Sequence, residues 1–313
     1  MRTALVATAA WVAVTAAGGD PQGHGRAVEA SSSQAAPGLV EAVPYARGAV
    51  LDVHRPPPGG VPADGARPPT VVLVHGCCGD RADLGWLAEA LTGAGALVLN
   101  ADWAGIDADA RFPDAYEEVA CAVRFARARA GDFGGDPARV VLTGWSDGAL
   151  AATVVATGGD TFDAARCVHP EASARPDAVV GIAGFYGWPL PVPARYVTPR
   201  GESFLGGTPA SAAEAWARAT PYGWPAGVHE PPAVLLVGTT DPLVDDARRY
   251  AAAQRAAGRS VRLLELPQAG DQTLLSPRTR EGQTVVAEVM AAGGRSALLL
   301  CQRFPGLAPC DPA

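Results

Sequence analysis

The stretch RVVLTGWSDGALAA, residues 139–152, decides the fold of this chain. It contains a short apolar strand, a G-x-S-x-G turn centred on Ser146, and a helix rich in alanine. The turn is so tight that side chains at Gly144 and Gly148 would collide with the flanking backbone. The pattern alone is a weak signal in a chain with 37 glycines, but a strand before it and a helix after it make it specific. We expect the Ser146 hydroxyl to stand above a sheet, on a strained backbone.

Outward from this turn, short apolar strands alternate with amphipathic helices. Strands are expected at 49–53, 70–74, 96–99, 139–142, 178–182, 233–237 and 261–266. Helices are expected at 82–91, 114–130, 149–157, 243–257 and 282–292. This alternation is typical of an α/β fold with a mostly parallel sheet and helices on both faces. We predict one domain over residues 43–313, with residues 186–230, rich in Pro, Gly and Trp, as a small lid insertion.

The N-terminus has the pattern of an export signal. One basic residue, Arg2, precedes the uncharged stretch Thr3–Ala17, and small residues follow it. We interpret residues 1–17 as a signal peptide and residues 18–42 as a disordered leader, and expect a secreted protein. The stretch is too short and too rich in alanine to predict a membrane span. The alternative is that all these residues form a disordered leader.

Net charge and cysteine content indicate which ligands and crosslinks to expect. A net charge of −7 gives no reason to expect a nucleic-acid partner, which requires a basic face. Export allows the six cysteines to form disulfides. Position along the chain predicts two pairs, Cys121–Cys167 and Cys301–Cys310. No C-x-x-C pair or histidine-rich partner accompanies them, so we expect no metal.

The chain resembles the carboxylesterase/lipase branch of the α/β-hydrolases, especially the exported bacterial members, over roughly residues 45–292. The resemblance rests on VHG at 74–76, ACAVRF at 120–125, DFGGDP at 132–137, the Ser146 turn and GTTD at 238–241. It implies an α/β-hydrolase fold, a serine nucleophile, a small-molecule ester or hydrophobic ligand, and no cofactor. In similar sequences the cysteines corresponding to Cys121 and Cys167 are also suited to pair.

The resemblance also implies an oxyanion hole. The sequence His75-Gly76-Cys77-Cys78-Gly79 follows the strand at 70–74, where relatives often carry His-Gly-Gly-Gly. Attack on an ester creates an oxyanion that needs at least two N–H donors. The amide of Asp147 and that of Cys77, or alternatively Cys78, fit these roles, and His75 is expected to be architectural. A zinc or redox role for the adjacent cysteines is the alternative, but this pair lacks partner ligands.

The acid and the base of the triad are expected after the last two strands. Family order is serine, acid, histidine. Asp241 fits the acid, with helix capping as an alternative or additional role. Relatives carry a Gly-His step after the last strand, but here Gly270 is followed by Asp271. An ordinary carboxylate, with a pKa of about 4, is a weak base for a serine proton.

The other histidines offer no obvious replacement. They are His24, His54, His75, His169 and His229. A base must come within hydrogen-bond reach of the hydroxyl, and only His169 or His229 is an alternative that could swing in from the lid.

These residues predict a serine-type carboxylic ester hydrolase whose activity is weak because the catalytic histidine is absent. A second hypothesis is a non-catalytic derivative that binds an ester-like or hydrophobic ligand beneath the lid. Its pocket would be lined by Phe185, Tyr186, Trp188 and Trp224, although ordinary packing is the favoured interpretation of these aromatic residues. A third is a serine peptidase of the same fold.

Overall fold

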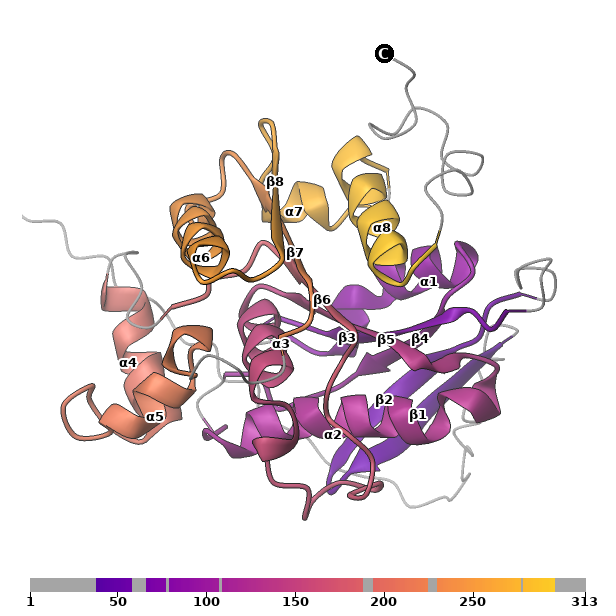
Figure 1. Cartoon of the computed structure of the whole chain (residues 1–313), viewed down its shortest axis with the longest axis horizontal. Coiled ribbons are helices and arrows are strands. Elements are labelled where there is room, and N and C mark those ends of the chain that lie inside the picture. The colour runs from indigo at the N-terminus through magenta and orange to yellow at the C-terminus, as the bar shows by residue number, and fades with distance from the viewer. Residues whose placement is uncertain are drawn as a thin grey trace, which may run out of the picture. The chain divides into compact units, whose positions relative to one another are not determined.

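In the part of the chain that the computed structural model describes, eight strands form one sheet in the order β1-β2-β4-β3-β5-β6-β7-β8 (Figure 1). The described residues are 38–57, 66–76, 79–106, 109–187, 194–224, 230–276 and 278–295. The strands are β1 (Leu39–Ala46), β2 (Ala49–His54), β3 (Pro69–Val74), β4 (Leu97–Ala101), β5 (Asp136–Trp145), β6 (Ala178–Ile182), β7 (Ala233–Gly238) and β8 (Val261–Leu266).

The helices lie mostly between the strands in sequence. They are α1 (Gly85–Gly93), α2 (Asp114–Arg129), α3 (Asp147–Gly158), α4 (Ala194–Leu205), α5 (Ala213–Arg218), α6 (Val244–Ala256), α7 (Asp271–Leu274) and α8 (Arg280–Ala292). Short 3₁₀ turns are η1 (Arg81–Leu84), η2 (Ala130–Phe133), η3 (Gly159–Thr161) and η4 (Pro221–Gly223). Strands β3 to β8 pair in parallel, whereas β1 and β2 join antiparallel at one edge. The predicted mostly parallel α/β sheet is confirmed.

Alternate residues of the central strands face two different cores. On β3, Val71 and Leu73 pack with α1 and α8, whereas Val72 and Val74 pack with α2 and α3. Helix α6 covers β7 and β8 on the α3 side of the sheet (Figure 1). Burial on both faces explains why β3 is a continuous apolar run rather than an alternating one.

The structure differs from the sequence prediction at a few elements. Strand β1 begins at Leu39, so residues 39–42 are not part of a disordered leader as we predicted. The helix expected at 82–91 begins as the 3₁₀ turn η1 and continues as α1. The segment 186–230, which we predicted to be a lid, contains the helices α4 and α5, and the short helix α7 follows β8. Residues 1–37 lie outside the described residues.

The predicted Cys121–Cys167 disulfide is confirmed. It joins α2 to the segment that precedes β6, across a sequence separation of 46 residues. Cys167 also forms an isolated bridge with Ala46 of β1. A crosslink over such a separation stabilises the fold mainly by restricting the unfolded chain. Cys77, Cys78, Cys301 and Cys310 lie outside the described residues.

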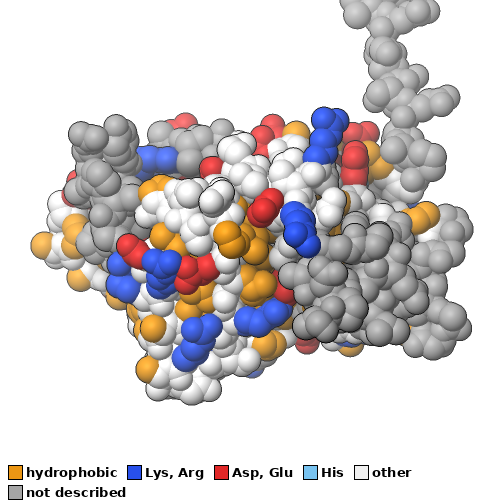
Figure 2. All heavy atoms as spheres, turned by 90° about the horizontal axis from the view of Figure 1, so that it is seen from above, with side chains coloured by type: hydrophobic (Ala, Val, Ile, Leu, Met, Phe, Trp, Pro, Cys, Tyr) orange, Lys and Arg blue, Asp and Glu red, His pale blue; other side chains and the backbone are white. Residues whose placement is uncertain are grey.

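Strand β8 ends the sheet and carries charged side chains. Arg262 pairs with Glu288 of α8, and Glu265 pairs with Arg248 of α6. From the side on which β8, α6 and α8 lie, basic and acidic side chains are interspersed around apolar surface (Figure 2). Charges on an edge strand hinder pairing with other chains. In the described part of the chain, no helix has the length and apolar character needed to cross a membrane.

Candidate active site

Ser146 occupies a sharp turn between β5 and α3. Its backbone angles are φ 54° and ψ −120°, a strained conformation for a residue with a side chain. The Ser146 amide donates to the Ile182 carbonyl at 2.9 Å, which ties the turn to β6. A Cβ at Gly144 would lie 2.1 Å from the Gly148 carbonyl oxygen, and one at Gly148 would lie 2.3 Å from the His75 carbonyl oxygen. The fold therefore requires both glycines of the turn.

The register of β3 and β5 brings the loop after β3 to this turn. Val74 pairs with Gly144, so His75 and Gly76 continue beside Trp145 and Ser146. A Cβ at Gly76 would lie 3.2 Å from the Ser146 Cβ. The predicted oxyanion loop thus begins directly against the predicted nucleophile.

His75 is almost completely buried, at 1% exposure. Its Nδ1 lies 2.7 Å from the Gly76 carbonyl oxygen, and its Nε2 lies 3.6 Å from an oxygen of Asp102. These contacts fit the expected architectural role, with the ring directed at its own loop and at Asp102. Asp147 begins α3, where backbone N–H groups and the helix dipole favour negative charge. Cys77 and Cys78 lie outside the described residues.

Asp241 follows β7 at the same carboxyl edge of the sheet. Its side chain is 5% exposed, and its Oδ1 accepts a hydrogen bond from the Leu243 amide at 2.8 Å. This bond closes the turn before α6, whose N-cap is Leu243 with no side-chain cap, so Asp241 does not cap the helix as the alternative interpretation expected. Burial raises the pKa of Asp241, the Leu243 amide opposes this, and the nearby charge of Asp271 raises it further. Asp241 and Asp271 are thus electrostatic neighbours.

The loops after β7 and β8, which carry Asp241 and Asp271, are joined by hydrogen bonds. The Thr240 hydroxyl donates to the Ala269 carbonyl at 2.7 Å, and the Gln268 amide donates to the Thr239 hydroxyl at 2.8 Å. Asp271 is exposed and begins α7. Non-glycine residues with positive φ follow β5, β6 and β8 on this edge, namely Ser146, Ala183 and Gln268. Strained backbone gathers at functional sites, and here it marks the carboxyl edge.

Two of the described histidines lie at the opposite, amino edge of the sheet. His54 pairs with Val98 near the start of β4. His169 lies in the segment between α3 and β6, with its Nδ1 3.3 Å from Glu171. Helix α3 spans about 18 Å at 1.5 Å per residue, so that segment cannot reach Ser146. The hypothesis that His169 swings in from the lid is therefore wrong; His24 and His229 lie outside the described residues.

The aromatic residues proposed to line a lid pocket pack elsewhere. Phe185 and Tyr186 are buried in the cores, and Tyr186 stacks on Tyr250 with ring centres 4.7 Å apart. Trp224 packs on Phe162 and would contact a Cβ at Gly158, at the far end of α3 from Ser146. Ordinary packing is thus the correct interpretation of these three residues. Trp188 lies outside the described residues.

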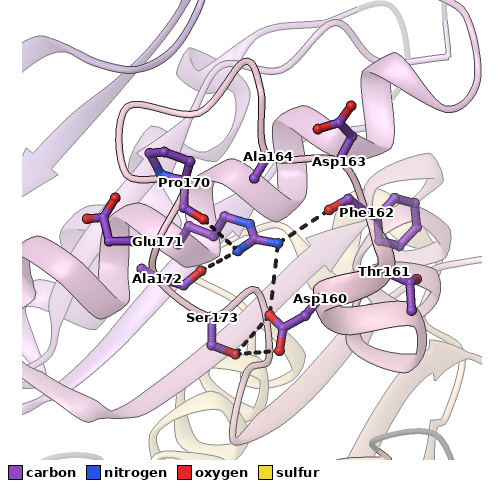
Figure 3. A pocket seen from close by; sticks show the side chains of 10 residues that line it. Asp160, Thr161, Phe162, Asp163, Ala164, Pro170, Glu171, Ala172 and Ser173 are labelled. Atoms are coloured by element: carbon purple, nitrogen blue, oxygen red, sulfur yellow. Dashed lines mark hydrogen bonds and ion pairs between the residues drawn. The ribbon is translucent and has the colours of Figure 1, made fainter.

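A pocket of about 560 Å³ lies at the amino edge, lined by residues 160–164 and 170–173 together with Arg124 (Figure 3). The Arg124 guanidinium donates to the carbonyls of Phe162, Pro170 and Ala172. Asp160 accepts from the Ser173 hydroxyl at 3.0 Å. These bonds tie the pocket walls together, although the buried Arg124 Nε has no hydrogen-bond partner among the described residues. We assign the pocket a structural role. Within the described residues no cluster of three or more His, Cys, Asp or Glu side chains is suited to a metal.

The sequence did not predict the residues that support His75 at the start of the expected oxyanion loop. Arg81 of η1 binds Asp52 at 2.8 Å and Asp102 at 2.7 Å, and Trp103 donates to the His75 carbonyl at 3.0 Å. These contacts join residues far apart in the chain. The one signal in the sequence is that Asp102 and Trp103 directly follow a buried strand, which indicates a position at the carboxyl edge of the sheet.

The raised pKa of Asp241 predicts a stabilising substitution. Asp241→Asn keeps the oxygen that accepts from Leu243 and removes a buried negative charge. A raised pKa means that the carboxyl stabilises the fold below its unfolded pKa, and this contribution is lost as pH rises through the folded pKa. We expect Asp241→Asn to raise the melting temperature at pH 7 by about 2–4 °C, as about 1 kcal/mol does in a domain of this size.

The gain of Asp241→Asn should disappear near pH 3, where the carboxyl of the natural chain is protonated in both states. Calorimetry of both chains at the two pH values tests this. Equal melting temperatures at pH 7, or a gain retained undiminished at low pH, would show that the buried charge costs no stability.

Comparison with known proteins identifies a matching family and solved structures with a similar fold. The BD-FAE family model matches residues 51–254. The thermophilic esterase Est2 of Thermogutta terrifontis, with butyrate bound, has a TM-score of 0.62 and 20% identity over 87% of this chain and 96% of its own. The same esterase phosphonylated by sarin has a TM-score of 0.60 and 19% identity, covering 83% of this chain and 92% of that one.

A bifunctional GH43-CE of Bacteroides eggerthii has a TM-score of 0.67 and 20% identity over 83% of this chain, which spans 36% of that protein. The comparison with curated protein sequences found no match. At such identities the solved structures establish a shared fold.

Proposed function

Because this chain belongs to the BD-FAE family of α/β-hydrolase esterases, we propose that it descends from serine-type carboxylic ester hydrolases and uses Ser146 as its nucleophile. The observation that carries the proposal is the strained Ser146 turn at the amino end of α3, with Gly76 beside it. The half-buried Ser146 hydroxyl on such a turn is suited to attack an ester carbonyl.

The proposed reaction gives these groups the roles expected in a serine hydrolase. The Ser146 oxygen bonds to the acyl carbon, the carbonyl becomes an oxyanion, and the amides of Asp147 and Cys77 stabilise it. The serine proton must pass to a base and then to the leaving alcohol, and water completes the cycle by releasing the acid. In this proposal Asp241 orients the base that accepts the Ser146 proton.

The base is the weak element of the proposal. Asp271 occupies the position expected for histidine, and among the described residues only His75 is an imidazole at this edge. A carboxylate is shorter than imidazole and a poorer proton acceptor at neutral pH. We propose that the natural chain hydrolyses esters weakly. The substrate is a small ester, in line with the butyrate bound to Est2.

The presence of Asp271 at the position expected for the histidine base favours a second candidate function. A chain that keeps the turn and the oxyanion loop but lacks a base can bind an ester-like ligand without turning it over. Tight ligand binding without hydrolysis would support this alternative.

Covalent labelling tests the role of Ser146. A fluorophosphonate probe reacts with activated hydroxyls, and Est2 is itself phosphonylated by sarin. We expect the probe to modify the peptide that contains Ser146, slowly in the natural chain, and Ser146→Ala to abolish the label. Thr143→Ser is the matched control, because it places a second serine on buried β5 away from the turn. Label at any other residue, or label retained in Ser146→Ala, would refute the proposed nucleophile.

A further inference from the structure

The segment after β4, residues 102–104, contacts both the backbone and the ring of His75. Trp103 is 3% exposed, and its Nε1 donates to the His75 carbonyl at 3.0 Å. An oxygen of Asp102 lies 3.6 Å from His75 Nε2. One short segment therefore holds the residue with which the oxyanion loop begins.

This segment is itself fixed on several sides. The Asp102 amide donates to the Val50 carbonyl at 3.0 Å, and the Tyr45 hydroxyl donates to the Asp102 carbonyl at 3.1 Å. The Ala104 amide donates to a carboxylate oxygen of the largely buried Glu118 at 2.9 Å. These bonds connect the segment to strands β1 and β2 and to helix α2, so it forms a rigid support.

The supported atoms lie against the nucleophile turn. The His75 carbonyl that accepts from Trp103 is the same group that leaves no room for a Cβ at Gly148. The next residue, Gly76, approaches Ser146. Removing the indole donor would leave a buried carbonyl without its partner and free this loop to move.

We propose that Trp103 is a positioning residue, which holds His75 and Gly76, the described start of the oxyanion loop, against the Ser146 turn through the His75 carbonyl. The inference rests on the proposed function for the role of that loop. Misplacing an oxyanion donor by about 1 Å is enough to cost about a hundredfold in rate.

The same indole links the loop to the lid. The Trp103 ring lies 6.2 Å from the Tyr116 ring, and Tyr116 lies 5.5 Å from Phe204 of α4. The Phe112 amide donates to the Phe204 carbonyl at 2.9 Å. Lid helix α4 and the oxyanion loop therefore share the aromatic support that Trp103 completes.

Trp103→Phe tests the inference, because it removes the N–H donor and keeps an aromatic ring. Trp224→Phe is the matched control, since Trp224 also donates from Nε1 to a carbonyl, that of Arg218 at 3.1 Å, but at the amino edge. Each substitution is made in two backgrounds. In the natural chain we measure hydrogen exchange of peptides spanning residues 75–84. In a host chain that also carries Asp271→His we measure steady-state kinetics.

We expect Trp103→Phe to accelerate exchange in that segment at least about tenfold while α3 stays protected. In the Asp271→His host, kcat should fall about tenfold to a hundredfold with KM changed less than about twofold. Trp224→Phe should leave both readouts unchanged. Unchanged exchange in Trp103→Phe, or an equal acceleration in Trp224→Phe, would overturn the inference.

The two readouts distinguish failure of the proposed function from failure of the inference about Trp103. If the Asp271→His host is inactive, the proposed function fails, and hydrogen exchange alone still decides whether Trp103 holds the loop. Should Trp103→Phe not fold, Asp102→Asn removes the ion pair with Arg81 and is measured in the same two ways. Loop exchange as slow in Asp102→Asn as in the natural chain would then count against the support by residues 102–104.

Discussion

Asp271→His should raise kcat/KM for a short acyl ester by at least about 10³-fold. Asp271 begins α7 directly after Gly270, on the carboxyl edge that also carries Ser146 and Asp241. It is exposed, so an imidazole at this position meets no packed core. Asp241 is its electrostatic neighbour, and we expect it to accept a hydrogen bond from the new ring.

The size of this effect follows from what a histidine does in a serine hydrolase. Removing it costs on the order of 10⁶-fold in kcat, and about 10³-fold over water remains from the oxyanion hole and binding. Restoring an imidazole without optimising its surroundings should recover a large part of the difference. The substitution also removes the like charge that raises the pKa of Asp241, which favours its ionised form.

A neighbouring substitution gives the matched control. Gln272→His places an imidazole one residue further along α7, also on an exposed side chain. Steady-state hydrolysis by the natural chain and the two variants should show a gain for Asp271→His alone. An equal gain in both variants, or none in either, would mean that position 271 is not the place of the missing base.

Gly144→Ala should cost on the order of 3 kcal/mol or more in the free energy of unfolding. A Cβ at this position would lie 2.1 Å from the Gly148 carbonyl oxygen and 2.6 Å from the Ala149 nitrogen. Both contacts are with backbone atoms of the turn and the first turn of α3, so no flexible side chain can move aside. The strand and the helix must separate, and the Ser146 turn must open.

Urea unfolding measures this cost. Gly85→Ala is the matched control, because a Cβ at Gly85 has no atom within 4 Å among its described surroundings and the residue has helical angles. We expect this control to be neutral or slightly stabilising, since alanine favours helix over glycine. A cost for Gly144→Ala no larger than that of the control would show that the turn is not as tight as the structure has it.

The central strands and the Ser146 turn could be predicted because their signals are local. β6 and β8 have the bounds expected from their apolar runs, and the 144–148 motif fixes the turn between β5 and α3. The parallel arrangement then follows from the alternation of strands and helices. It also places Ser146, Asp241 and Asp271 on one edge, because each follows a parallel strand.

Other elements depend on contacts that no local pattern encodes. β1 starts at Leu39 because it pairs with β2, although its exposed face carries little apolar alternation. Helix α4 includes Pro199, which disfavours a helix in sequence-based prediction. The support of His75 by Trp103 joins residues 28 apart, and the amino-edge position of His169 emerges only from the course of α3 and β6.

Turnover of a short acyl ester by the natural chain, corrected with Ser146→Ala, tests the central claim most directly. A serine nucleophile without an imidazole base predicts a Ser146-dependent rate well below the ordinary esterase range of about 1–10³ s⁻¹. A Ser146-dependent rate within that range would contradict it, because the chain would then contain a base that this account does not assign.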